Sequence, residues 1–169
     1  MTRRARRGFT LIELMVTLAI MAMLLMIAVP AVGRAIQNAR TSSLVHRLPQ
    51  DMAWARNRSA TGPLPYRIVL GPGCQWRAQQ AAFGAGGTLS WGTNAETAVR
   101  SLDAATAAAQ YPGATCTLSG AGTQTITFDH QGQIADNAPT VRIASGNGQT
   151  WVLQVLLSGL VLLNAGTSS

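Results

Sequence analysis

The most uniform hydrophobic pattern in the chain lies near its start. Residues 14 to 29 carry no charge and are almost all apolar, and Pro30 follows them. From Phe9 to Gly33 the segment is 25 residues long. A helix of that length rises about 1.5 Å per residue and can cross about 30 Å of bilayer hydrocarbon with some tilt. The pattern predicts a membrane-spanning helix.

A second helical pattern follows, in which apolar residues recur mostly every three to five positions. They are Val32, Ile36, Ala39, Leu44, Leu48, Met52 and Ala55. Such a stripe predicts an amphipathic helix packed on a sheet. Pro30 and Gly33 predict a break or bend before it, and Pro49 predicts either a kink or the start of a second helix. Thr61-Gly62-Pro63 predicts the end of the helical region.

The rest of the chain has the short alternating runs and Gly-containing turns of an antiparallel sheet. Strands are predicted at 66–70, 74–79, 115–118, 123–128, 140–144, 150–157 and 160–163. Residues 80–113 predict a long surface excursion with a short helix within 101–110, and Gly146-Asn147-Gly148 predicts a hairpin turn. The apolar run 152–163 is too short and interrupted for a second membrane span, and predicts a core hairpin. The expected fold class is α+β: a long N-terminal helix on an antiparallel sheet.

One carboxylate sits at the edge of the apolar segment. A secretory signal or a plain membrane anchor accounts for the arginines at 3, 4, 6 and 7 and for the apolar run, but neither requires Glu13. A charge in the bilayer costs about 2.5–3.5 kcal/mol at the centre, less near the interface, unless it is paired. The Glu13 carboxylate therefore needs a partner to pair with its charge.

The stretch Arg-Arg-Gly8-Phe9-Thr-Leu-Ile-Glu13 resembles the class III leader of type IV pilins and type II secretion pseudopilins. The resemblance implies cleavage between Gly8 and Phe9 by prepilin peptidase, a membrane enzyme that also methylates the new amino terminus. It implies that Glu13 neutralises the terminal amine of a neighbouring subunit during assembly. It also implies a pilin-like fold and other pilins as partners through the N-terminal helix.

Weaker similarities narrow the family to GspH/FimT-type minor pilins and pseudopilins. They lie at Ala55-Arg56, Cys74-Gln75-Trp76, Ile126-Thr127-Phe128 with Gln131-Gly132, and the closing Val155-Leu-Leu-Ser-Gly159. Some FimT-like pilins bind DNA through a C-terminal Gly-Arg-x-Arg element. Here Gly159 is followed by Leu160, Val161 and Leu162, so both arginines are leucines and the cations that displace counterions from phosphate are missing. DNA binding by this element is not expected.

The distribution of charge along the chain also argues against a nucleic-acid-binding site. Of the thirteen arginines, four lie before Gly8, and cleavage leaves nine against six acids, a formal charge of +3. The remaining basic excess lies between residues 34 and 58, and the sequence from residue 59 onward is formally neutral. A basic stripe of this kind more often marks a solvated or subunit-facing helix surface than a nucleic-acid site.

Cys74 and Cys116 are the two cysteines, and export would place them in an oxidising compartment. A disulfide between them is expected. Neither a metal site nor a cofactor site is expected, because two cysteines fall short of the usual four zinc ligands. The adjacent Asp129 and His130 suggest a catalytic triad, but adjacent strand residues point to opposite sides and no serine lies in a nucleophile-elbow motif. The chain is not expected to be an enzyme.

Four segments are expected: a leader at 1–8, an apolar helix at 9–33, an amphipathic stalk helix at 34–62 and a β-rich head at 63–169. The leader arginines are expected to stay cytoplasmic, and the head of this single-pass protein of the bacterial inner membrane is expected to lie in the periplasm. The protein is then expected to enter a pilus or pseudopilus. The expected function is that of a type IV pilus minor pilin in assembly, priming or the tip. The alternatives are an H-type pseudopilin of type II secretion and a DNA-uptake pilin.

Overall fold

A computed structural model describes residues 9–84, 86–91, 98–136 and 138–166, with the side chains of Ala98 and Val99 left aside. The chain divides into two compact units, residues 1–36 and 37–169. Each unit is considered on its own below. The expected leader, including Gly8, lies outside the described residues.

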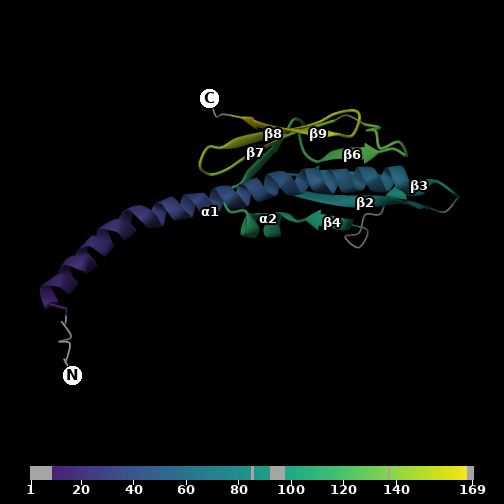
Figure 1. The fold of residues 1–169 in the computed structure, drawn as a ribbon. Helices are drawn as coiled ribbons and strands as arrows, with labels where there is room; N and C mark the ends of the chain where they lie inside the picture. The colour runs from purple at the N-terminus through teal and green to yellow at the C-terminus, as the bar shows by residue number, and fades with distance from the viewer. Residues whose placement is uncertain (1–8, 85, 92–97, 137, 167–169) are drawn as a thin grey trace, which may run out of the picture. The chain divides into compact units, whose positions relative to one another are not determined.

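A single helix, α1 (Leu11–Thr61), accounts for both helical patterns of the sequence (Figure 1). α1 runs through Pro30, Gly33 and Pro49, so a full break at the first two positions and a new helix starting at the third are both wrong. A bend at Pro30 and Gly33, or a kink at Pro49, within this continuous helix stays a prediction. A proline removes one backbone donor from the helix interior. The many good helix formers around each proline, such as Leu, Met and Ala, keep the rest of the ladder intact.

The expected stripe on this helix begins later than its pattern suggested. Val32 and Ile36 are exposed, whereas the packed stripe runs from Thr41 to Ser59. Its buried members are Thr41, Leu44, Val45, Leu48, Asp51, Met52, Ala55 and Ser59. Only this part of the helix has a head to pack against within its own unit.

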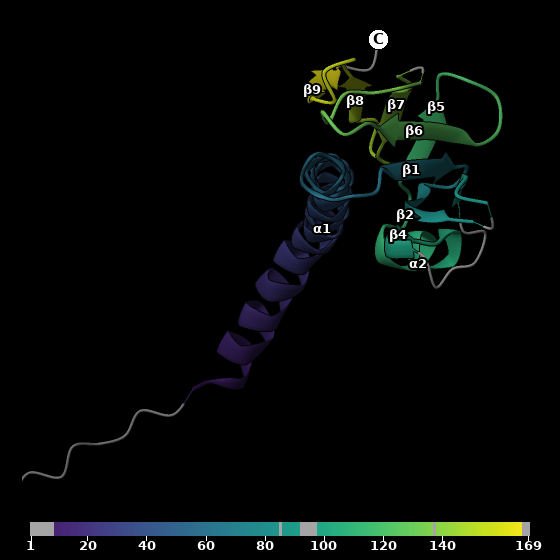
Figure 2. The ribbon, with the colours of Figure 1, turned by 90° about the vertical axis from the view of Figure 1, so that its right-hand side faces the viewer.

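The head contains two antiparallel sheets. The first has the order β3-β2-β1-β6, with β4 also paired to β2, and the second has the order β5-β7-β8-β9 (Figure 2). The first sheet's strands are β1 (Tyr66–Gly71), β2 (Gln75–Phe83), β3 (Leu89–Trp91), β4 (Ala98–Leu102) and β6 (Gln124–Phe128). The second sheet's strands are β5 (Thr115–Leu118), β7 (Thr140–Ala144), β8 (Thr150–Val155) and β9 (Val161–Gly166). The short helix α2 (Ala104–Gln110) joins β4 to β5, as the alanine-rich stretch predicted.

One hydrophobic core joins the helix stripe to both sheets. Fully buried members include Leu48 and Met52 of α1, Ile68 of β1, Phe128 of β6 and Leu153 of β8. In β6 and β7, buried residues alternate with more exposed ones, which is why alternating runs were visible in the sequence. The α+β architecture expected from that alternation is confirmed.

Two expectations about the sheets need correction. Residues 80–113 are not one surface excursion, because the end of β2, all of β3 and all of β4 fall within them. β3 has three residues, and Arg100 and Ser101 interrupt the apolar residues of β4, so the apolar alternation of these strands is faint. The 152–163 run does form the β8–β9 hairpin, but only its β8 half is core: Leu153 and Val155 are buried, while Leu162 and Leu163 are exposed.

Candidate functional site

The start of α1 holds Glu13, to which the sequence assigned assembly, and follows Phe9, one of the two residues assigned to processing. Phe9 is 81% exposed and lies two residues before the helix begins. The Thr10 hydroxyl accepts a hydrogen bond from the backbone N–H of Glu13 at 3.3 Å, and the Thr10 carbonyl accepts one from Leu14 at 3.2 Å. Thr10 therefore caps the helix, with Glu13 in the third helical position of an S/T-x-x-E capping box.

This geometry gives Glu13 a local role that the sequence argument did not consider. An acidic residue in the first turn lies at the positive end of the helix dipole, where it stabilises the helix by about 0.3–1 kcal/mol. The carboxylate is exposed and available for a second partner. Helix capping and subunit contact are compatible uses of the same residue.

The N-terminal unit exposes its apolar surface along its whole described length. No residue from Phe9 to Gln37 is buried, although most are large and apolar. By length and composition, α1 is the one described helix able to cross a membrane, and its apolar part lies near the N-terminus. An apolar surface this large on a soluble monomer marks a membrane or protein contact. This segment is the strongest candidate for a functional site.

The head contains a buried charge that the sequence analysis missed. The Asp51 side chain of α1 is 7% exposed, and Arg100 of β4 donates to its Oδ1 at 2.9 Å. Its other oxygen, Oδ2, accepts a hydrogen bond from the indole Nε1–H of Trp76 on β2, also at 2.9 Å. These bonds tie the helix to two strands. In the sequence, Asp51 is one of six acids and lies in a segment that is otherwise rich in arginine.

Arginines and tryptophans surround this buried aspartate. The Arg100 guanidinium carbon lies 5.2 Å from the centroid of the Trp54 ring, and that of Arg47 lies 5.8 Å from the Trp76 centroid. An open polar groove of about 740 Å³ runs past them, lined by Ser43, His46, Arg47, Gln50, Asp51, Arg100 and Ser101. Arg47, part of the stalk's basic stripe, thus contacts the head of its own chain, a role that a solvated or subunit-facing helix surface does not include.

Three of the sequence segments that resemble GspH/FimT-type pilins contact one another in the head. Arg56 of α1 donates from Nε to the backbone carbonyl of Gly132 at 3.0 Å. Gly159, in the turn between β8 and β9, lies against both residues with a φ of +76°. The Ser-Gly turn that aligned with the DNA-binding element is therefore a packing site in this chain, and Leu160 beyond it is 53% exposed.

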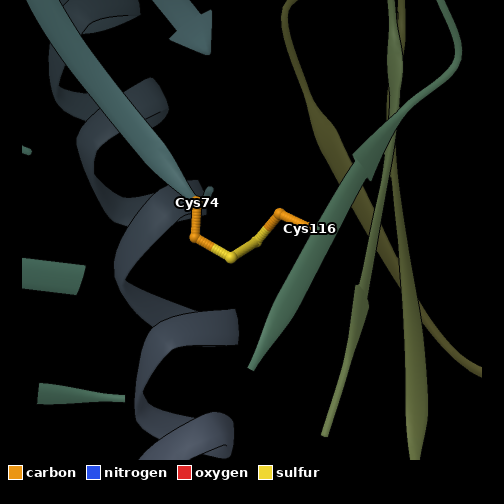
Figure 3. Close-up of a disulfide and its surroundings, with 2 residues drawn as sticks. All are labelled: Cys74 and Cys116. Carbon is orange, nitrogen blue, oxygen red and sulfur yellow. A yellow bond between two sulfur atoms is a disulfide. The ribbon is translucent and has the colours of Figure 1, made fainter. Parts of the chain in front are cut away.

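The predicted disulfide between Cys74 and Cys116 is present, with a Cα–Cα separation of 5.0 Å. Cys74 ends the turn between β1 and β2, and Cys116 lies on β5, so the bond links the two sheets (Figure 3). Both sulfurs face the interior of the head, and Cys74 is buried. The bond holds together two sheets that backbone ladders do not join.

Asp129 and His130, the pair considered for catalysis, form a turn. The Asp129 carboxylate Oδ1 accepts the backbone N–H groups of Gln131 and Gln133 at 2.9 and 2.8 Å. His130 is exposed. Within the described part of the chain, no group of three or more His, Cys, Asp and Glu side chains could hold a metal ion.

Comparisons with known proteins agree with the description of the N-terminal segment and with that of the fold. Residues 3–29 match the prokaryotic N-terminal methylation motif. The structure resembles that of the type IV minor pilin FimU of Pseudomonas aeruginosa with a TM-score of 0.53 and 19% identity, covering 75% of this chain and 98% of that one. It resembles the minor pseudopilin EpsH of the Vibrio cholerae type 2 secretion system with a TM-score of 0.52 and 9% identity, covering 75% and 97%. No curated protein sequence matches the chain. The chain thus has an N-terminal methylation motif and the pilin-like fold.

Proposed function

We propose that this chain is a minor pilin, a structural subunit that inserts in the bacterial inner membrane and joins a type IV pilus. The observation that carries the proposal is the apolar helix from Phe9 to Gln37, which buries no residue in its own chain and carries the methylation motif. Lipid covers such a helix before assembly, and the helices of neighbouring subunits cover it afterwards. Its function is assembly and involves no catalytic step.

Processing at the start of the helix is part of the proposal. Prepilin peptidase cuts between Gly8 and Phe9 and methylates the Phe9 amine. Arg3, Arg4, Arg6 and Arg7 remain on the cytoplasmic side, which directs the head to the periplasm. The intact mass of the protein purified from its own host tests this step. A product that lacks eight residues and carries one added methyl group is expected, and retention of Met1 to Gly8 would contradict it.

Glu13 is proposed to pair with the amine of a neighbouring subunit. Two substitutions separate this role from capping. Glu13→Leu removes both the charge and the polar side chain, whereas Glu13→Gln keeps a polar side chain suited to the third helical position and removes only the charge. Both variants are expected to insert in the membrane, and both are expected to enter filaments poorly.

The measurement compares the amount of each variant in the membrane fraction with the amount in sheared filaments. Thr10→Ala is the matched control, since it weakens the cap and leaves the carboxylate in place. Filaments that contain Glu13→Gln at wild-type levels would rule out charge pairing. Strong loss of incorporation with Thr10→Ala would assign the effect to the helix terminus.

A second candidate is a minor pseudopilin of type II secretion. The resemblance to EpsH favours it, because its TM-score of 0.52 is close to the 0.53 found with FimU. Deleting the gene distinguishes the two machines: loss of surface pili supports the first proposal, and loss of an exported enzyme with pili intact supports the second. The neighbouring genes distinguish the same two machines with less work. Pilus-assembly genes beside this one support the first proposal, and secretion genes support the second.

A further inference from the structure

The last strand of the head lies at an open edge of its sheet. Among the described residues β9 pairs with β8 alone, in the order β5-β7-β8-β9. Both faces of β9 are exposed: Leu162 and Leu163, which point to opposite sides, are 45% and 37% exposed. Leu160, just before the strand, is 53% exposed. The edge thus offers leucines as well as a row of backbone groups.

Nothing in the sequence of this region discourages pairing with another strand. Natural edge strands usually carry charges, prolines or bulges that block the approach of a second chain. The segment from Ile143 to Ser169 contains no Asp, Glu, Lys, Arg or Pro. β4, at an edge of the other sheet, carries Arg100 and is followed directly by Asp103. The C-terminal edge thus lacks the charges that accompany β4.

The hydrogen-bond pattern of the hairpin identifies the free backbone groups. Leu156 N–H donates to the Leu160 carbonyl at 2.8 Å, which makes these two residues a hydrogen-bonded pair. Hydrogen-bonded and non-hydrogen-bonded pairs alternate along an antiparallel ladder. Counting along β9, residues 162, 164 and 166 bond to β8. The N–H and C=O groups of Val161, Leu163 and Ala165 therefore point out to the open edge.

These three residues form a self-complementary set. If two β9 strands meet antiparallel with Leu163 opposite its own copy, Val161 of each strand faces Ala165 of the other. Every outward N–H and C=O of the three residues then finds a partner, and two leucines lie side by side across the new ladder. A charged strand would lose its solvation here without an opposite charge in return. The best match for this uncharged edge is the same edge on a second copy.

We propose that β9 is a docking edge for a second copy of this chain, paired antiparallel about Leu163. The contact is isologous, so it forms dimers and does not extend by itself. One short strand gives a weak contact in dilute solution. Two copies anchored in one membrane have a high effective concentration, which favours the contact. The inference goes beyond the proposed function, since it concerns the head and not the N-terminal helix.

Cysteine cross-linking of the full-length protein in native membranes tests the pairing. Opposite residues in a hydrogen-bonded pair have Cα atoms about 5.5 Å apart, within the range for a disulfide. Mild oxidation of Leu163→Cys should therefore give a covalent dimer. The matched control is Leu160→Cys, which is more exposed and lies outside the strand; it should give several-fold less dimer. The native cysteines are bonded to each other and do not compete.

Two outcomes would overturn the proposal. One is equal cross-linking of the two variants, which would indicate random collision of exposed thiols. The other is a product whose mass differs from twice that of the chain, which would identify a different partner. Adding Ala165→Pro to Leu163→Cys removes one outward N–H and no bond to β8, so it should suppress the dimer. Persistence of the dimer in that double variant would also contradict the proposed register.

Discussion

The Nε–H of Arg56 on α1 donates to the backbone carbonyl of Gly132 at 3.0 Å, across 76 residues of sequence. Gly159 packs against both Arg56 and Gly132. A Cβ built on Gly159 would overlap the Gly132 carbonyl oxygen and lie 2.9 Å from Cδ of Arg56. The bond fixes the helix against the loop after β6, and the glycine lets the β8–β9 turn pack on top of it.

Gly159→Ala is expected to destabilise the head by about 2–4 kcal/mol, from a positive φ together with overpacking. Gly148→Ala is the matched control: its φ is +84°, but no atom lies within 4 Å of the new Cβ. It should cost only the backbone strain, about 1–2 kcal/mol. Denaturant unfolding of the two variants measures the difference, and equal costs would mean that the contact with Gly132 is unimportant.

Removing the buried carboxylate of Asp51 should be among the most damaging changes in the head. Asp51→Ala leaves the Trp76 indole N–H without its acceptor and Arg100 without its partner, and we expect a loss of about 2–4 kcal/mol. Asp51→Asn keeps an acceptor for Trp76 and should cost less.

Arg100→Ala provides the comparison for this site. Its side chain is 46% exposed, so solvent screens much of the pair's attraction. It should cost less than Asp51→Ala, because Asp51 retains its bond from Trp76. A larger loss with Arg100→Ala, measured by the same unfolding curves, would contradict this order.

The disulfide between Cys74 and Cys116 closes a loop of 42 residues. The chain-entropy model gives such a bond about 3–4 kcal/mol of stabilisation. The double variant Cys74→Ser/Cys116→Ser should have a free energy of unfolding lower by that amount, measured by denaturant unfolding. Wild-type protein unfolded in reducing buffer is the control, and it should match the variant. No change in either case would mean that the sheets are held together by the core alone.

Much of the fold was predictable because its signals are local. Sixteen uncharged residues, alternating apolar positions and Gly-Asn-Gly are each read within a short window, and α1, most of the strands and the β7–β8 turn follow from them. The methylation motif is contiguous and so was equally visible. Two cysteines in the chain leave one possible intramolecular pairing, which the structure contains.

The missed features depend on tertiary contacts. Asp51 looks solvent-facing in a stripe of arginines until Trp76 and Arg100 are placed beside it. Pro30 and Pro49 predict an interruption of the helix because each proline lacks a backbone N–H donor. The prediction takes no account of the intact backbone hydrogen bonds in the neighbouring turns. The strands β3 and β4 within 80–113 are short, and each is established by pairing with β2.

The short helix α2 provides a pH-dependent test. Asp103 caps it, accepting from the hydroxyl of Thr106 at 2.6 Å and from its backbone N–H at 2.8 Å. The Thr106 hydroxyl bond, followed by the backbone bond, lowers the pKa of Asp103 below its ordinary value. A depressed folded pKa means that the cap stabilises above the unfolded value and is lost as pH falls through the folded one.

Amide exchange of α2 should therefore accelerate as the pH is lowered below about 4, the ordinary range of an aspartate. The comparison is with Asp103→Asn, which keeps a capping side chain but does not titrate there. The variant should lack this acid-dependent step once intrinsic exchange rates are corrected for. The same step in both proteins would assign the pH effect to another group.

The two leucines after Gly159 give a prediction about nucleic acid. In a fragment covering residues 34–169, the wild-type head should bind duplex DNA weakly. Leu160→Arg/Leu162→Arg places cations on exposed positions of the β8–β9 turn and β9, where the resembling element has its arginines. Each phosphate neutralised steepens the plot of log affinity against log salt by about 0.9, so the double variant should bind more tightly with a slope steeper by up to about two. Leu160→Gln/Leu162→Gln, polar but uncharged, should stay near wild type in a gel-shift series over salt concentration. Tight, salt-sensitive binding by the wild-type fragment would instead locate a DNA surface elsewhere in the head, with the stalk arginines the first residues to substitute.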